Sequence, residues 1–268
     1  MSMNNKQITT TQTFHLLSND TPFAVRESFN QLRTNLMYTF PEDNCCPIFG
    51  ITSVRESEGK STVIANLAVS FSQIGKKVLL VDADMRCPTL YHFFKMDSQH
   101  TGLSEMISGI ESNGIIADAL PNLDLILSGR IPPNPSELLV SNKLKELIEA
   151  WKETYDIIFF DFPPVGLISD ALSLCKELTG YIFNIGSGQD NAKDINATLE
   201  AMEQVGAKIV GLTLNDYNMK GSGSDYRRNQ YSGYLKYSRR IKSGGKYGMS
   251  HYEKSYLKES KKSNDTKQ

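Results

Sequence analysis

Gly59, Lys60 and Ser61 stand in succession where an apolar strand pattern gives way to an apolar helical pattern, within residues 48–74. Backbone N–H groups and the helix dipole favour an anion at a helix start, where glycine lets the backbone approach and lysine can reach the outer phosphates. A serine hydroxyl in this place can ligate Mg²⁺. The stretch 49–62 therefore predicts a phosphate-binding loop.

The loop departs from the pattern G-x-x-x-x-G-K-[ST], because Val54 occupies the first glycine position. Gly-Lys-Ser alone also begins helices that bind nothing. The side chains beside the motif, Ser57, Glu58 and Thr62, are counted as candidate nucleotide contacts. The rest of the chain must decide between the two interpretations.

Carboxylates follow two other apolar runs. Asp82 and Asp84 come after the run 78–81, and Asp161 comes after the predicted strand 155–160, whose last four residues are apolar. A carboxylate at the end of a buried strand is costly unless it has a function, and α/β sheets bind ligands at that edge. Mg²⁺ held there would bridge nucleotide phosphates. The predicted metal ligands are Ser61, Asp82 and Asp161.

Strand and helix patterns alternate along the chain, which predicts a parallel sheet covered on both faces. The expected strands besides the one before the loop are 78–81, 123–127, 155–160, 180–185 and 208–214. The expected helices besides the one after the loop are 22–40, 137–151 and 191–205. Ser136 is the expected N-cap of the helix 137–151, Asp170 is expected to cap a later helix, and Asn215 ends the last strand.

Composition narrows the class of protein. The four cysteines among 268 residues have neither metal-ligand spacing nor a disulfide framework, which indicates a reducing compartment. No apolar run approaches the roughly 20 residues that span a bilayer, and the polar start is no signal peptide. We therefore expect a cytoplasmic protein with a flexible N-terminus (1–20), a nucleotide-binding domain (21–216) and a tail (217–268).

The tail differs from the rest of the chain in charge. It carries 13 lysines and arginines and 4 acidic residues, a net charge of +9, whereas residues 1–216 carry 16 and 26, a net charge of −10. Eight of the twelve tyrosines lie in it: Tyr217, Tyr226, Tyr231, Tyr234, Tyr237, Tyr247, Tyr252 and Tyr256. Without apolar periodicity the tail is predicted to be flexible, and its charge should attract it to an acidic body.

Together these motifs resemble those of the bacterial tyrosine kinases (BY-kinases). The resemblance rests on D-x-D-x-R at 82–86, the strand end IIFFDFPP at 157–164, the segment IPPNPSELL at 131–139 and the tyrosine-rich end. It covers about residues 23–215. It implies a P-loop NTPase-like fold, with a mostly parallel sheet between helices, and transfer of phosphate from ATP to protein tyrosine.

The resemblance also implies residue roles on the nucleotide side. Lys60 contacts phosphates, and Ser61 and Asp161 hold Mg²⁺ directly or through water. Asn215 lies near the adenine. Where relatives often have Pro-Gly, this loop has Glu56-Ser57.

On the tyrosine side, the resemblance implies that Asp82 is the base for the incoming hydroxyl, while Asp84 and Arg86 organise the site. The implied acceptors are tyrosines of the tail: Tyr226, Tyr231, Tyr234, Tyr237, Tyr247, Tyr252 and Tyr256. An oligomerisation motif of the family, Glu-x-x-Arg-x-x-Arg, appears here as Glu27-x-x-Asn30-x-x-Arg33. Glu27 and Arg33 are thus candidate contacts in a ring of unphosphorylated subunits.

The implied setting is polysaccharide export, with a separate transmembrane adaptor as activator, a location at the inner face of the membrane and a cognate tyrosine phosphatase. Nucleic acid is not an expected partner. Two alternatives remain: a spatial-organisation ATPase of the ParA/MinD type, in which a tyrosine-rich tail has no role, and a non-catalytic protein whose tail binds anionic lipid or polymer.

Overall fold

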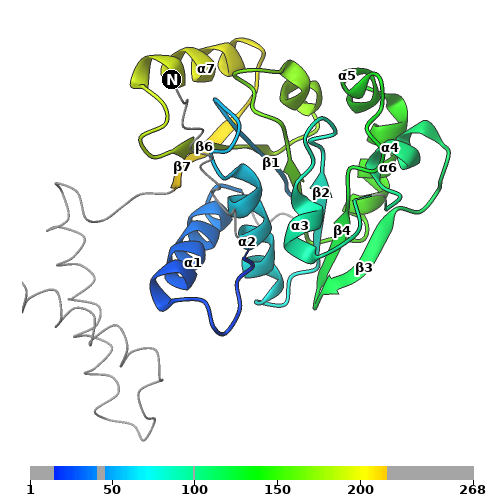
Figure 1. The fold of residues 1–268 in the computed structure, drawn as a ribbon, viewed down its shortest axis with the longest axis horizontal. Coiled ribbons are helices and arrows are strands. Elements are labelled where there is room, and N and C mark those ends of the chain that lie inside the picture. The colour runs from blue at the N-terminus through cyan, green and yellow to red at the C-terminus, as the bar shows by residue number, and fades with distance from the viewer. Residues whose placement is uncertain (1–14, 41–45, 99, 216–268) are drawn as a thin grey trace, which may run out of the picture. The chain divides into compact units, whose positions relative to one another are not determined.

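The computed structural model describes residues 15–40, 46–98 and 100–215 (Figure 1). Within them the strands form one sheet in the order β3-β4-β2-β5-β1-β6-β7, parallel throughout except for the antiparallel pair β3–β4. The strands are β1 (Ile48–Ser53), β2 (Val78–Asp82), β3 (Ile115–Leu120), β4 (Leu123–Ile126), β5 (Ile157–Asp161), β6 (Gly180–Gly186) and β7 (Ile209–Asn215). A mostly parallel sheet, as predicted, is confirmed.

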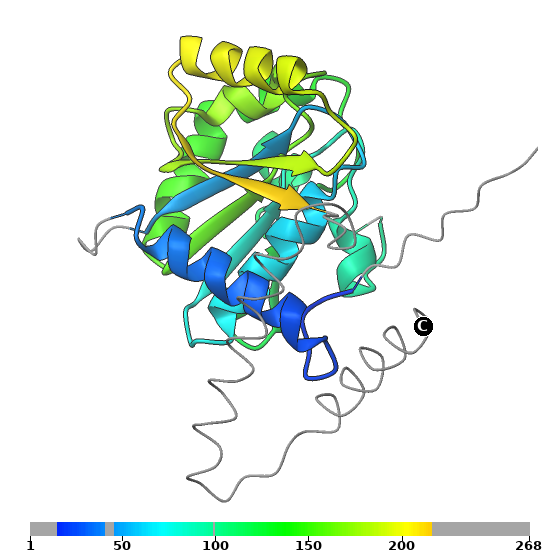
Figure 2. The ribbon, with the colours of Figure 1, turned by 90° about the vertical axis from the view of Figure 1, so that its left-hand side faces the viewer.

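Helices cover both faces of this sheet, with α1 and α2 on one side and α7 on the other (Figure 2). The first face carries α1 (Phe23–Met37), α2 (Lys60–Ser72) and α3 (Leu90–Phe94). The second face carries α4 (Leu103–Ser108), α5 (Pro135–Leu139), α6 (Asn142–Lys152), the 3₁₀-helix η1 (Ser169–Leu174) and α7 (Ala192–Gln204). Each face buries its own apolar cluster.

Three local predictions were wrong. The sheet gains the edge strand β3, which follows no clean alternation and is only partly buried. The single helix expected at 137–151 is two helices, and Ser141, whose hydroxyl accepts from the Leu144 N–H at 3.3 Å, caps the second, whereas Ser136 caps neither. Asp170 lies inside η1 and binds Arg86 instead of capping a helix.

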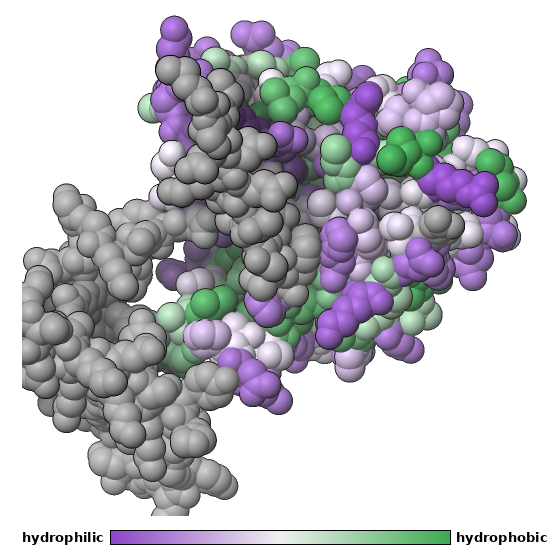
Figure 3. Space-filling view, viewed as in Figure 1, coloured by the Kyte–Doolittle hydropathy of each residue, from purple (hydrophilic) through white to green (hydrophobic). Residues whose placement is uncertain are grey.

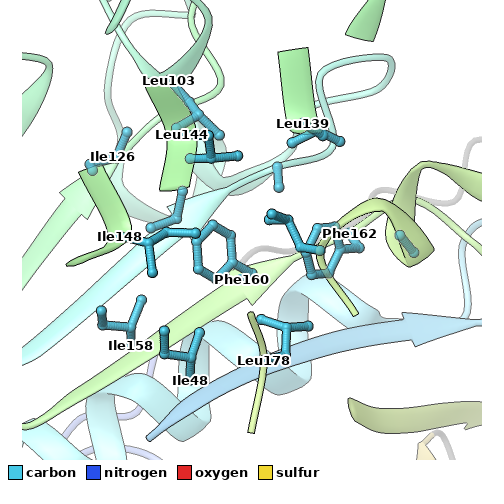
Figure 4. Packing of buried hydrophobic residues seen from close by; sticks show 14 of the residues in the cluster. Ile48, Leu103, Ile126, Leu139, Leu144, Ile148, Ile158, Phe160, Phe162 and Leu178 are labelled. Carbon is cyan, nitrogen blue, oxygen red and sulfur yellow. The ribbon is translucent and has the colours of Figure 1, made fainter. Parts of the chain in front are cut away.

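Phe162 belongs to the core. It follows β5 directly, is fully buried, and stacks on Phe160 with ring centroids 5.7 Å apart. Figure 4 shows both rings among apolar side chains from α6 and β1. A Cβ on Gly50 would stand 2.6 Å from the Phe162 ring, so β1 must have glycine where this ring packs.

The predicted N-terminal segment 1–20 is described from residue 15 onward. There Leu17 is buried against the α1–α2 face, and its N–H donates to Asn66 Oδ1 at 2.7 Å. Asn66 Nδ2 in turn donates to the His15 carbonyl at 3.1 Å. The helix that begins at the loop therefore also holds this N-terminal segment.

On the surface drawn in Figure 3, apolar and polar residues are interspersed. Among the residues that the structure describes, we find no helix with the length and hydropathy needed to cross a membrane.

Candidate active site

The predicted loop lies between the end of β1 and Lys60, the first residue of α2. Gly59 has a φ of 85°, and a Cβ there would stand 1.9 Å from Asn215 Nδ2, so only glycine fits. Ser57 is also left-handed, with a φ of 62°, a conformation that costs a serine roughly 1 to 2 kcal/mol. The surroundings therefore hold the loop in a conformation that its own residues do not favour.

Glu58 fixes this conformation from within the protein. Its carboxylate accepts from the Arg55 N–H at 2.9 Å and from the Gly186 N–H at 3.2 Å. Its carbonyl accepts from Asn184 Nδ2 at 2.8 Å and from Asn215 Nδ2 at 3.0 Å. The Glu58 side chain is thus turned toward the end of β6 and is buried, whereas Glu56 is exposed.

Ion pairs of Arg55 also join the loop to α7 and to Asp190, the carboxylate-bearing residue that precedes this helix in the sequence. Arg55 Nε lies 3.2 Å from Asp190 Oδ1, and its Nη2 donates to Asp194 Oδ2 at 2.7 Å. Burial and the adjacent Glu58 raise the pKa of Asp190 to about 6. Burial by itself would raise the pKa of Glu58, but its hydrogen bonds, including that with Asp190, lower it. The proton of this acid pair therefore resides on Asp190 at mildly acidic pH.

The two residues after Gly59 lie close to groups at the ends of β2 and β5. Lys60 is buried, and its positive charge acts on the nearby Asp84 and Asp161. The Ser61 hydroxyl accepts from Thr89 Oγ1 at 2.8 Å, which links the loop to the segment after β2. Thr62, a predicted nucleotide contact, is exposed.

Two of the predicted acids are direct neighbours in the sheet. Asp82 and Asp161 end β2 and β5 and are register partners across the parallel pair. Asp82 accepts from the N–H groups of Asp84 and Leu90, at 3.2 and 3.3 Å. Both carboxylate oxygens of Asp161 are buried and accept no hydrogen bond.

Burial makes these carboxylates hard to ionise. It raises the pKa of Asp161 to about 7, against the opposing charge of Lys60. Burial and the nearby Asp161 and Asp84 raise the pKa of Asp82 well above its usual value, and burial also raises the pKa of Asp84. A cation bound between these carboxylates would favour their charged forms.

These donors fit Mg²⁺. The unpaired oxygens of Asp161 and the Ser61 hydroxyl are hard oxygen ligands on neighbouring elements. Mg²⁺ commonly takes one or two protein oxygens and completes its shell with phosphates and water.

Arg86 is held by two residues from other elements. Its Nε donates to Asp170 Oδ2 at 2.8 Å, and its Nη2 lies 3.3 Å from both Asp170 Oδ1 and Ser136 Oγ. Ser136 donates to Asp170 at 2.6 Å. Burial would raise the pKa of Asp170, but these bonds lower it. The segment after β2 is thereby fastened to α5 and η1, beside the acids.

The structure brings together the predicted residues of the loop and the strand ends, and adds others. Asn184 and Thr89 were not predicted, and Asp170 and Ser136 were predicted only as caps. Asn184 lies near the carboxyl end of β6, so the reasoning that singled out strand-end acids could have found it. Thr89 and the Arg86 clamp depend on contacts between distant segments.

Two further sets of residues were predicted, the oligomerisation contacts and the acceptor tyrosines. Arg33 on α1 donates to the Ser70 carbonyl and hydroxyl of α2, both at 2.7 Å, so it also ties two helices of its own chain. Glu27 lies on the same helix. The tail tyrosines fall outside the described residues.

Comparisons with known proteins identify the class of this fold. The AAA domain family model matches residues 51–176. The kinase domain of Escherichia coli tyrosine kinase ETK superposes with a TM-score of 0.68 at 31% identity, covering 74% of this chain and 77% of that one. MinD from Pyrococcus horikoshii, solved with Mg-ADP, gives a TM-score of 0.54 at 27% identity, over 67% and 73%. The fold and site thus define a P-loop nucleotide-binding enzyme.

Sequence similarity gives the family. The tyrosine-protein kinase CpsD of Streptococcus agalactiae serotype III is 39% identical over 194 residues, which are 72% of this chain and 82% of that protein. This chain belongs to the bacterial tyrosine kinases. It is a protein-tyrosine kinase, and the expected family and activity are confirmed.

Proposed function

We propose that this kinase transfers the γ-phosphate of ATP to the tyrosines of its own C-terminal tail, on a neighbouring subunit, and thereby controls its assembly. The observation that carries the proposal is the place where the tail begins. β7 ends at Asn215, whose side chain contacts Glu58 in the phosphate-binding loop, and the tyrosine-rich sequence continues from there. A tail of charge +9 suits the body of a neighbouring subunit, because residues 1–216 carry a net charge of −10.

Residues of the loop would position ATP. The N–H groups at the start of α2 and the Lys60 ammonium would hold its phosphates, while Ser61 and Asp161 would hold Mg²⁺. The ion supplies charge neutralisation for the phosphates. Asn184 and Asn215 keep the loop in shape by binding the Glu58 carbonyl.

Asp82 would act on the acceptor. The tyrosine oxygen attacks the γ-phosphorus, the bond to the bridging oxygen breaks, ADP leaves, and the phenolic proton passes to the Asp82 carboxylate. The raised pKa of Asp82 makes its carboxylate a stronger base. Arg86 would not act directly in this arrangement, because Asp170 and Ser136 hold it.

Phosphorylation would cancel the positive charge of the tail. Each phosphate adds roughly −1.5 to −2, so about five phosphotyrosines would cancel a charge of +9. The attraction between the tail and the body of a neighbouring subunit would then fade, and an assembly that depends on it would loosen. Glu27 and Arg33 on α1 would contribute to that assembly.

Mixing two variants tests the transfer. An active chain with all eight tail tyrosines replaced by phenylalanine is incubated with Mg·ATP and a Lys60→Met chain that keeps its tyrosines. Phosphotyrosine on the Lys60→Met tail, located by mass spectrometry, is the expected result. An unmodified tail there, while the unmixed wild-type protein modifies its own, would show transfer within one chain.

We further propose the setting that the family resemblance implies: a transmembrane adaptor that activates the kinase at the inner face of the membrane, a cognate phosphatase that reverses it, and control of polysaccharide export. Co-purification of the kinase with the products of its neighbouring genes tests this. A membrane protein that raises phosphotyrosine is expected, and activity unchanged by every such product would contradict it.

A further inference from the structure

We propose that Tyr38, at the end of α1, is a further phosphorylation site, modified by another copy of the chain. The proposal rests on the proposed self-phosphorylation and adds an acceptor outside the tail. It follows from comparing the four tyrosines that precede the tail, which are Tyr38, Tyr91, Tyr155 and Tyr181.

Packing limits access to three of these four. Tyr155 is 6% exposed and donates to Asp124 at 2.7 Å. Tyr181 is fully buried and donates to the Ala171 carbonyl. Tyr91 is partly buried against the apolar cluster of the α1–α2 face. Tyr38, in contrast, is 86% exposed, which makes it the most exposed of the tyrosines that the structure describes.

The backbone hydrogen bonds at Tyr38 are also weak. Its N–H is shared between the Thr34 and Asn35 carbonyls at 3.3 and 3.2 Å, in the turn that follows the last helical residue. Long, shared bonds at a helix end open at little cost. A kinase must bring its acceptor into a site lined by Asp82, and the exposed Tyr38 side chain projects from this weakly bonded turn.

Tyr38 is out of reach of its own active site. The ring of Phe40, two residues later, contacts Phe49 at the start of β1, with centroids 5.5 Å apart. The phosphate-binding loop follows the opposite end of β1, and the six residues of that strand span about 20 Å. Tyr38 and the loop therefore lie at opposite edges of the sheet, and the phosphate must come from another subunit.

In that reaction the Tyr38 oxygen attacks the γ-phosphorus of ATP bound to the second subunit. The bond to the bridging oxygen breaks, ADP leaves, and the phenolic proton passes to Asp82 of the second subunit. Each atom transferred comes from ATP or the tyrosine.

The product would alter α1. A phosphate brings roughly −1.5 to −2 charge to the negative end of the helix dipole, and the last turn of α1 has no basic residue to offset it. Tyr38 directly follows Met37, the last residue of α1, and α1 is the helix that carries Arg33. The modification would therefore add charge at the end of the helix that is proposed to join subunits.

A labelled acceptor makes the test specific. The acceptor is the full ¹⁵N-labelled chain with Lys60→Met and all eight tail tyrosines replaced by phenylalanine. The donor is the unlabelled chain with Tyr38→Phe, whose tail is intact. After incubation with Mg·ATP, trypsin releases Tyr38 in the peptide 34–55 and Tyr91 in the peptide 87–95, each as the sole tyrosine.

The expected result is phosphate on the labelled peptide 34–55 and none on 87–95, at an initial rate that rises tenfold with tenfold more donor. An unmodified labelled 34–55 beside a phosphorylated donor tail would overturn the Tyr38 site and leave the proposed function standing. No phosphotyrosine on either chain would overturn both. Equal modification of both labelled peptides would show that exposure does not select the acceptor, which also overturns the inference.

Discussion

Asp82 and Asp161 end adjacent parallel strands as register partners, so two buried carboxylates face one edge of the sheet side by side. Asp82 receives two backbone N–H groups, whereas Asp161 receives none. Because of this difference in hydrogen bonding, the two carboxylates suit different roles. The supported carboxylate suits a base that must keep its position, and the unpaired one suits a cation ligand.

The unpaired carboxylate should make stability depend on pH. A folded pKa of about 7 lies above the ordinary 3.8, so the protonated acid is favoured by folding, and stability is lost as pH rises toward 7. Between pH 5 and pH 8 the loss is about 3 kcal/mol. Asp161→Asn should remove most of this loss while abolishing Mg²⁺-dependent turnover. Urea unfolding without Mg²⁺ or nucleotide at both pH values measures it, and equal pH slopes in the two proteins would contradict it.

Asp82→Asn should reduce turnover more than tenfold, which is roughly 1.4 kcal/mol, because the amide cannot take the phenolic proton. The affinity for Mg·ATP should stay within about threefold, since the phosphates and the ion are held by other residues. Single-turnover kinetics and titration calorimetry give the two quantities. A turnover close to that of the wild type would show that Asp82 is not the base.

Asn184→Ala should raise the KM for ATP about tenfold, because the buried Glu58 carbonyl loses a donor and the loop loses a support worth roughly 1 to 2 kcal/mol. Thr213→Val is the matched control, since the Thr213 hydroxyl donates only to Asn184 Oδ1. Its effect should stay below about threefold. A KM for Asn184→Ala within about threefold of the wild-type value would contradict the role of Asn184 in supporting the loop, and a higher KM for Thr213→Val as well would show that Thr213 must hold Asn184 in place.

Glu27→Ala with Arg33→Ala should yield a monomer whose self-phosphorylation per molecule is slow when dilute and rises with protein concentration. Because Arg33 also binds Ser70 within its own chain, Ser70→Ala serves as the control. That variant loses the Ser70 hydroxyl but keeps Arg33 for a partner subunit. Light scattering should show an oligomer for Ser70→Ala. A monomer there would mean that Arg33 acts through helix packing.

The sequence was sufficient for the parts of the site that lie at strand ends. Runs such as 78–81 and 157–160 are apolar throughout, so they had to be buried strands, and the acids after them had to meet at one edge. Once those acids are present, a Gly-Lys-Ser sequence between a strand and a helix has few interpretations other than a phosphate-binding loop.

The parts of the site and of the fold that were not predicted depend on contacts between residues far apart in the sequence. Arg86 and Asp170 are 84 residues apart and meet only because β2, α5 and η1 converge. Its place in the loop predicts that Glu58 contacts the nucleotide, but its carboxylate accepts from the N–H of Gly186, which is 128 residues away, and is turned inward. The break between α5 and α6 was missed because the apolar spacing continues across it while Ser141 starts a new helix.

Every proposed step requires phosphates held at the start of α2, and Lys60 is the residue proposed to hold them. Purified wild-type protein and its Lys60→Met variant are incubated with Mg·ATP and probed for phosphotyrosine, with circular dichroism to compare their folds. We expect phosphotyrosine in the tail of the wild type and a loss of at least a hundredfold in a variant that keeps its fold. Undiminished phosphotyrosine in folded Lys60→Met would contradict the proposed phosphate transfer.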